Sequence, residues 1–119
     1  MNKYHAKAAY ADGIKFSSTF ERNRYLLLKG MEDSGEIKDL MLQVKFEIIP
    51  KQDGERAAHY IADFVYEKDG NIVVEDTKGF STPDYILKRK LMMLVHGIRI
   101  QEVRLGEQGK SNRKKYRKK

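Results

Sequence analysis

The sequence has 119 residues, of which 40% are hydrophobic and 34% charged, as expected for one globular domain. It contains no cysteine, which excludes disulfide bonds and thiolate metal sites. No apolar run approaches the roughly 18 residues that a membrane-spanning helix needs, and the N-terminus lacks the apolar core of a signal peptide. We therefore expect a cytoplasmic protein without membrane contact.

The net charge of +7 is concentrated at the C-terminal end. Residues 106–119 contain seven basic side chains and one acidic side chain, whereas residues 1–105 contain 17 basic and 16 acidic ones. This asymmetry predicts a nearly neutral domain over 1–105 and a basic, disordered tail over 106–119. Such a tail either binds nucleic acid through phosphate charge or only keeps the protein soluble. The expected phosphate contacts in the tail are Arg113, Lys114, Lys115 and Arg117.

The first predicted elements are a helix and a strand. Ser18 is followed three residues later by Glu21, a capping-box pattern, so a helix is expected to begin there and to end near Gly35. Residues before this helix look polar and irregular. Between residues 40 and 48 apolar and polar side chains alternate, which is typical of a half-buried strand.

The remaining elements complete the order α-β-β-β-α-β. Two strands, over about 58–67 and 71–78, are joined by Asp69-Gly70, a strong two-residue hairpin signal. Thr82-Pro83 starts a second helix that continues to about residue 97, and a last strand lies near 98–103. This order predicts an α/β fold with a mixed sheet flanked by helices. The second helix is expected to have an apolar face formed by Leu87, Leu91, Leu94 and Val95.

The hairpin brings charged residues together at the far end of the third strand. With a two-residue turn at Asp69-Gly70, Asp63 lies opposite Asp76, and the period of a strand places Lys78 on the same face. Glu75 then points to the opposite face, level with Phe64. Two opposed carboxylates destabilise a sheet unless something compensates them. Either a hard divalent cation such as Mg²⁺ or Mn²⁺ does so, or Lys78 forms a salt bridge with one aspartate.

These residues also match a known pattern. Asp63 followed by Asp76-Thr77-Lys78 resembles the D…(D/E)-x-K signature of the PD-(D/E)XK nuclease superfamily, although Ala62 stands where the signature has proline. Four longer phrases resemble a DUF1064-like family of small phage and prophage proteins placed in that superfamily. They are DGIKFSSTFERNRY, GEIKDLMLQVKFEIIPK, YIADFVYEKDG and VVEDTKGF. The resemblance covers about residues 3–105 and implies a restriction-endonuclease-like α-β-β-β-α-β core.

The resemblance implies a role for each matching residue. Asp63 would be the central metal ligand and Asp76 the second, with the backbone carbonyl of Thr77 as a third oxygen. Lys78 would position or activate the attacking water and stabilise charge on the phosphate. Glu21 corresponds to the acidic residue that many members contribute from the first helix, although it fits a helix cap equally well.

The implied function is that of a phage-encoded, metal-dependent DNA endonuclease in the bacterial host cytoplasm, acting in recombination, replication or packaging. One or two Mg²⁺ or Mn²⁺ ions would assist phosphodiester hydrolysis, with branched DNA as a candidate substrate and a homodimer as a candidate assembly. Lys88 on the second helix would contact phosphates, unless it belongs to a solvated face. The alternative is a nuclease fold that binds DNA or protein without catalysis, which would not need Asp63, Asp76 and Lys78 together.

Overall fold

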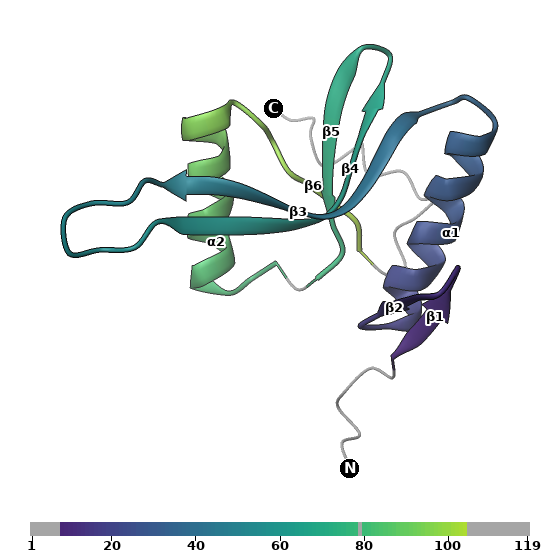
Figure 1. Ribbon diagram of the computed structural model, residues 1–119, viewed down its shortest axis with the longest axis horizontal. Helices are drawn as coiled ribbons and strands as arrows, with labels where there is room; N and C mark the ends of the chain where they lie inside the picture. Colours follow the sequence, from purple (N-terminus) through teal and green to yellow (C-terminus); the bar gives the residue numbers. More distant parts are fainter. Residues whose placement is uncertain (1–7, 79, 105–119) are drawn as a thin grey trace, which may run out of the picture.

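The structure is a computed structural model that describes residues 8–78 and 80–104 (Figure 1). It is a mixed α/β arrangement with a four-stranded sheet and a two-stranded sheet. The elements follow in the order β1 (Ala9–Ala11), β2 (Ile14–Phe16), α1 (Thr19–Asp33), β3 (Lys38–Ile49), β4 (Ala58–Lys68), β5 (Asn71–Asp76), α2 (Pro83–Leu91), the π-helical turn η1 (Met92–His96) and β6 (Gln101–Glu102).

The expected order α-β-β-β-α-β is present from α1 to β6. The large sheet has the strand order β3-β4-β5-β6; β3, β4 and β5 are antiparallel neighbours, and β6 is parallel to β5 after a crossover through α2. The third strand ends at Asp76, two residues earlier than predicted. Lys78 therefore lies beyond the strand, and the argument from strand period did not apply to it.

The β1–β2 hairpin was not predicted. It turns at Asp12-Gly13, where both residues have positive φ, as a two-residue hairpin turn requires. The hairpin is attached to α1, because the Tyr25 hydroxyl donates to Asp12 Oδ2 at 2.6 Å and the rings of Tyr25 and Phe16 lie 5.1 Å apart. The hairpin is thus a fixed part of the α1 side of the molecule.

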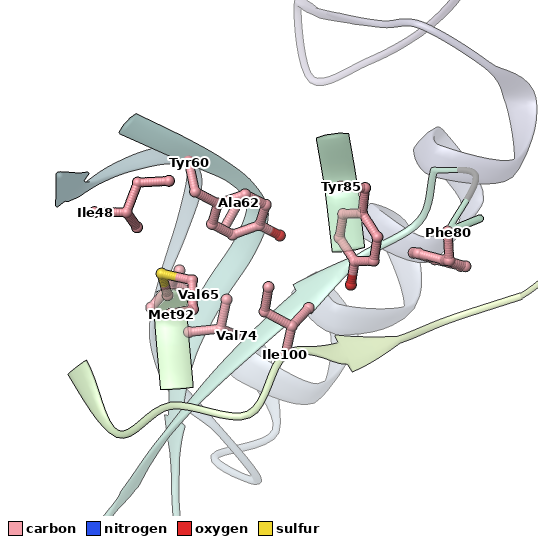
Figure 2. Packing of buried hydrophobic residues seen from close by; sticks show 9 residues of the cluster. All are labelled: Ile48, Tyr60, Ala62, Val65, Val74, Phe80, Tyr85, Met92 and Ile100. Atoms are coloured by element: carbon pink, nitrogen blue, oxygen red, sulfur yellow. The ribbon is translucent and has the colours of Figure 1, made fainter. Parts of the chain in front are cut away.

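Two hydrophobic clusters lie on opposite sides of the twisted sheet. One packs against α1 and contains Phe16, Tyr25, Leu28, Ile37, Phe64 and Tyr66. The other packs against α2 and η1 and contains Ile48, Tyr60, Ala62, Val65, Val74, Phe80, Tyr85, Met92 and Ile100 (Figure 2). Figure 1 shows β3 running from beside α1 across α2, with the loop of the long β3–β4 hairpin beyond α2. The buried apolar side chains therefore form two separate clusters, one on each face of the twisted sheet.

Strand β3 changes sides part-way along its length. Leu40 and Leu42 pack against the α1-side cluster, whereas Val44 packs against the α2-side cluster, although all three have even numbers. An untwisted strand would keep them on one face. The change occurs at Gln43, whose φ is +51°, so a left-handed backbone residue marks the point where the strand turns over.

The predicted apolar face of the second helix was wrong except for Leu91, which is partly buried and packs against the α2-side cluster. Leu87, Leu94 and Val95 are 54%, 79% and 49% exposed, and the helical segment is instead anchored in the core by Tyr85 and Met92. The Tyr85 hydroxyl donates to Glu102 Oε2 at 2.8 Å, which fixes the orientation of the helix against β6. In the described part of the chain, neither helix has the length and apolar character needed to cross a bilayer.

Candidate active site

The two aspartates lie at the inner end of the β4–β5 ladder. The observed register pairs Phe64 with Glu75 and Val65 with Val74, so the next opposed positions are Asp63 and Asp76, as predicted. Their exposed fractions are 0% and 3%. Two carboxylates are therefore buried beside each other, which is costly unless they are compensated.

Asp63 is held by residues that follow β5. Its Oδ2 accepts hydrogen bonds from the Thr77 amide at 2.8 Å and the Thr77 hydroxyl at 2.7 Å, and its Oδ1 accepts from Lys78 Nζ. Burial would raise the pKa of Asp63, but these donors outweigh burial and lower the pKa below its usual value. Asp63 is thus ionised, and Lys78 reaches it from outside the strand.

Asp76 is compensated less well. Its Oδ2 accepts from the Tyr60 hydroxyl at 2.5 Å and its Oδ1 from the Lys78 backbone amide at 2.9 Å. Burial raises the pKa of Asp76, and the neighbouring Asp63 charge adds to this effect against the lowering by Tyr60. The Tyr60 hydroxyl, itself buried against Asp76, also has a raised pKa.

Glu21 contributes its backbone N–H to the N-terminal cap of α1 and its carboxylate to the candidate site. Its backbone N–H donates to Ser18 Oγ at 3.0 Å, so Ser18 is the N-cap of α1. The carboxylate instead accepts from Ser17 Oγ at 2.7 Å and from Gln43 Nε2 at 3.3 Å. With an exposed fraction of 4%, the side chain is buried beside the aspartates.

By sequence alone Gln43 fits either a residue that lines the site or a structural residue of a half-exposed strand, and the structural interpretation was favoured. Its Nε2 donates to both Glu21 Oε2 and Asp63 Oδ1, each at 3.3 Å. The sequence showed only a polar residue in an alternating strand, which is ordinary on a half-exposed surface. The pairing of β3 with β4 offers the one usable signal, since it places Gln43 opposite Asp63.

Glu75 belongs to a separate cluster on the other face, as predicted from the register. Arg24 donates to its two oxygens at 2.8 and 2.7 Å, and the Tyr66 hydroxyl donates to Oε2 at 2.5 Å. Burial raises the pKa of Tyr66, and its hydrogen bond to Glu75 adds to the effect. Glu75 is therefore a fully paired structural carboxylate, distinct from the site.

Two hollows of about 300 Å³ each are lined in part by Lys78. The first is also lined by Lys15, Ser17, Glu21 and Gln43. The second is also lined by His59, Tyr60, Asp76, Thr82, Asp84, Tyr85 and Lys88. Lys88 forms a 3.4 Å ion pair with Asp84, yet it borders the same hollow as Asp76.

The predicted phosphate contacts of the C-terminal tail, Arg113, Lys114, Lys115 and Arg117, lie outside the described residues.

Over residues 1–118 the chain matches the model of a family described as "Protein of unknown function (DUF1064)". The chain belongs to this family. No curated protein and no solved structure matches it. This match confirms the predicted resemblance to the DUF1064 family, whereas membership of the PD-(D/E)XK nuclease superfamily stays a prediction.

The charges of the site do not balance. Glu21, Asp63 and Asp76 are all buried, and within the described ranges Lys78 is the only basic side chain at ion-pair distance from any of them. When all four groups are ionised, two negative charges remain in excess. Carboxylate oxygens and a negative excess suit Mg²⁺ or Mn²⁺. However, no three acidic or histidine side chains of residues 8–78 and 80–104 already converge closely enough to hold one ion.

Proposed function

We propose that this protein is a metal-dependent DNA endonuclease of the PD-(D/E)XK type that hydrolyses phosphodiester bonds. The observation that carries the proposal is the uncompensated carboxylate cluster of Glu21, Asp63 and Asp76 beside the Lys78 ammonium. A buried negative excess destabilises a fold unless a ligand uses it. The restriction-endonuclease-like core is part of the same proposal, supported by the order α-β-β-β-α-β.

The acidic residues of the site and Lys78 have different proposed roles. Asp63, Asp76 and Glu21 are the proposed ligands, with the Thr77 carbonyl as an additional oxygen. They would have to draw closer together on metal binding, because no three such side chains of the described residues already converge on one point. A bound Mg²⁺ or Mn²⁺ would supply Lewis acidity toward a phosphate oxygen. Burial lowers the pKa of Lys78, but the contact with Asp63 outweighs burial and raises it, so the amine stays protonated. Lys78 therefore acts through its charge, which stabilises the negative charge that develops on the phosphate.

The surroundings of Lys78 fit a polyanion. Of the two hollows that Lys78 lines, one is also lined by Lys15 and the other by Lys88. A nucleic-acid strand that crosses the site would meet a cation before and after the reacting phosphate, and the basic residues of 106–119 would add affinity without sequence preference. We therefore propose DNA as the partner, in the cytoplasm of a bacterial host as a phage or prophage product.

Cutting assays test this function. Supercoiled, linear and branched DNA are incubated with Mg²⁺, Mn²⁺ or EDTA and with wild type, Asp63→Asn or Lys78→Met. Asp39→Asn is the matched control, because Asp39 is an exposed carboxylate on the same sheet. Wild type and Asp39→Asn are expected to cut only with metal, and the two site variants to lose at least about 100-fold. Cutting in EDTA, or undiminished cutting by both site variants, would contradict the proposal.

A nuclease fold that binds DNA or protein without catalysis is the second candidate. The contact between Lys78 Nζ and Asp63 Oδ1 favours it, because this ammonium takes an oxygen that a metal would need. However, the Lys78 side chain is 54% exposed, so it can move into either hollow at small cost. Tight DNA binding with no cutting of any substrate would favour this candidate. Cleavage of both strands by a chain with one site would require two copies, and we propose a homodimer for that reaction.

A further inference from the structure

Gln43 has a backbone conformation that its residue type does not favour. Among residues 8–78 and 80–104, four residues other than glycine have positive φ, and three of them are aspartates: Asp12, Asp39 and Asp69. Aspartate tolerates the left-handed region because its short side chain can hydrogen-bond locally, whereas a longer side chain is strained there. Gln43, with φ +51°, is the exception. Strain of this kind persists only where the surrounding structure enforces it, and it concentrates at functional sites.

The neighbours of Gln43 in the sheet show why its backbone takes the left-handed conformation. The pairs Leu42–Phe64 and Val44–Ala62 flank it on β3 and β4, so Gln43 stands opposite Asp63. It is also the residue at which the even-numbered side chains of β3 change from the α1 side to the α2 side. The left-handed backbone thus turns the strand over where the site carboxylates are buried.

The side chain of Gln43 joins two acids from different elements. Its amide nitrogen has two protons, and it donates to Glu21 of α1 and Asp63 of β4 at 3.3 Å each. A neutral amide satisfies both carboxylates without cancelling their charge. Gln43 is exposed whereas both acids are buried, so it covers them from the hollow that Lys15 and Lys78 also line.

We infer that Gln43 is a positioning residue of this site: it ties the carboxylates of Glu21 and Asp63 to each other, so that both can draw together around a divalent cation. The inference rests on the proposed function, because it requires that the carboxylates bind metal. It assigns Gln43 no contact with substrate. Groups that orient metal ligands typically change metal affinity by about 10- to 100-fold when they are removed.

The test separates the amide from the backbone strain with three variants of the full chain. Gln43→Met keeps the length and the strained backbone but removes both donors. Gln43→Gly removes the donors and the strain together. Asp39→Gly replaces a left-handed residue of the same strand, with φ +54°, and leaves the amide in place. Mn²⁺ alone is titrated into each protein by calorimetry, and melting temperatures in EDTA verify that each variant is folded.

The expected result is that Gln43→Met and Gln43→Gly each weaken Mn²⁺ binding by about 10- to 100-fold, whereas Asp39→Gly binds like wild type. A purely structural role would change melting temperatures and leave Mn²⁺ affinity alone. If wild type binds Mn²⁺ and both Gln43 variants bind equally well, the inference is overturned and the proposed function stands. If wild type itself does not bind Mn²⁺, both are overturned.

Discussion

Glu75 and Asp76 are adjacent on β5, yet they face two different charge clusters. Glu75 points toward α1, where Arg24 pairs with both of its oxygens and the Tyr66 hydroxyl adds a third donor. Asp76 points away from this cluster, toward Asp63, and Glu21 from the first turn of α1 adds a third buried carboxylate near the one lysine. One cluster is balanced within the chain and the other is not.

The contrast between the two clusters shows how structural charges can be distinguished from functional ones. A buried carboxylate with a complete set of partners needs no explanation beyond folding. A buried negative excess has a cost that the fold alone does not justify, and such exceptions concentrate at functional sites. By this criterion the Glu75 cluster has a structural role, and the cluster around Asp63 is the candidate functional site.

The largest expected effect comes from breaking the balanced cluster. Arg24→Met leaves Glu75, which is 1% exposed, without its charged partner, and we expect a loss of about 3–5 kcal/mol in the free energy of unfolding. Lys78→Met should cost about 1 kcal/mol or less, because Lys78 is 54% exposed and Asp63 keeps both donors of Thr77. Urea denaturation measures both values. Equal losses would contradict the contrast between the clusters.

Smaller effects on stability, opposite in sign to each other, are expected when Glu75 and Asp76 are neutralised one at a time in metal-free protein. Glu75→Gln weakens the pairing with Arg24 and should destabilise by about 1–3 kcal/mol. Asp76→Asn removes a charge from the uncompensated cluster and should stabilise by about 1 kcal/mol. Thermal unfolding in EDTA at pH 7 measures both variants. Destabilisation by both would show that Asp76 is as well paired as Glu75.

The stabilisation by Asp76→Asn should also depend on pH with a defined sign. The pKa of Asp76 is raised in the folded protein, so its ionised form destabilises the fold at pH values above that raised pKa. The cost decreases as the pH falls below the folded-state pKa, and it is gone below the ordinary pKa of an aspartate, where the carboxyl is protonated in both the folded and the unfolded state. The difference in melting temperature between Asp76→Asn and wild type should therefore be largest at neutral pH and shrink on acidification. A difference that grows on acidification would contradict this account.

The smallest effect concerns the rim of the site. Lys88→Gln should weaken DNA binding a few-fold, and the slope of log affinity against log salt should fall by about 0.9 for one lost phosphate contact. Lys38→Gln is the control, since Lys38 is exposed at the start of β3 and lines neither hollow. Fluorescence anisotropy in EDTA measures binding without cutting. Identical slopes for wild type and Lys88→Gln would remove Lys88 from the interface.

Local patterns were sufficient for most of the fold. The alternation over 40–48, the Asp69-Gly70 turn and the cap at Thr82-Pro83 each depend on neighbouring residues, and each matches the observed elements. The β1–β2 hairpin has the same type of turn at Asp12-Gly13, but its three-residue strands are too short for alternation to be recognised. The buried side of α2 depends on contacts with β6, which helical periodicity does not contain.

The site was predictable only where register determines it. The position of Asp63 opposite Asp76 follows from the length of one turn, and the separation of Glu75 follows from the two-residue period of a strand. The role of Gln43 does not follow from either rule, because it depends on a left-handed residue within β3 and on the twist that brings α1 close. Propensities do not predict such a residue, since the tertiary structure imposes its conformation.

The central claim is that the buried carboxylates around Asp63 are kept for a divalent cation. Thermal and urea unfolding with and without Mn²⁺ test it most directly in wild type, Asp63→Asn and the exposed control Asp39→Asn. At Mn²⁺ concentrations about 100 times the dissociation constant, we expect a gain of about 2.7 kcal/mol in wild type and in Asp39→Asn. Asp63→Asn should show no gain. Equal gains in all three proteins, or none in wild type, would contradict the claim.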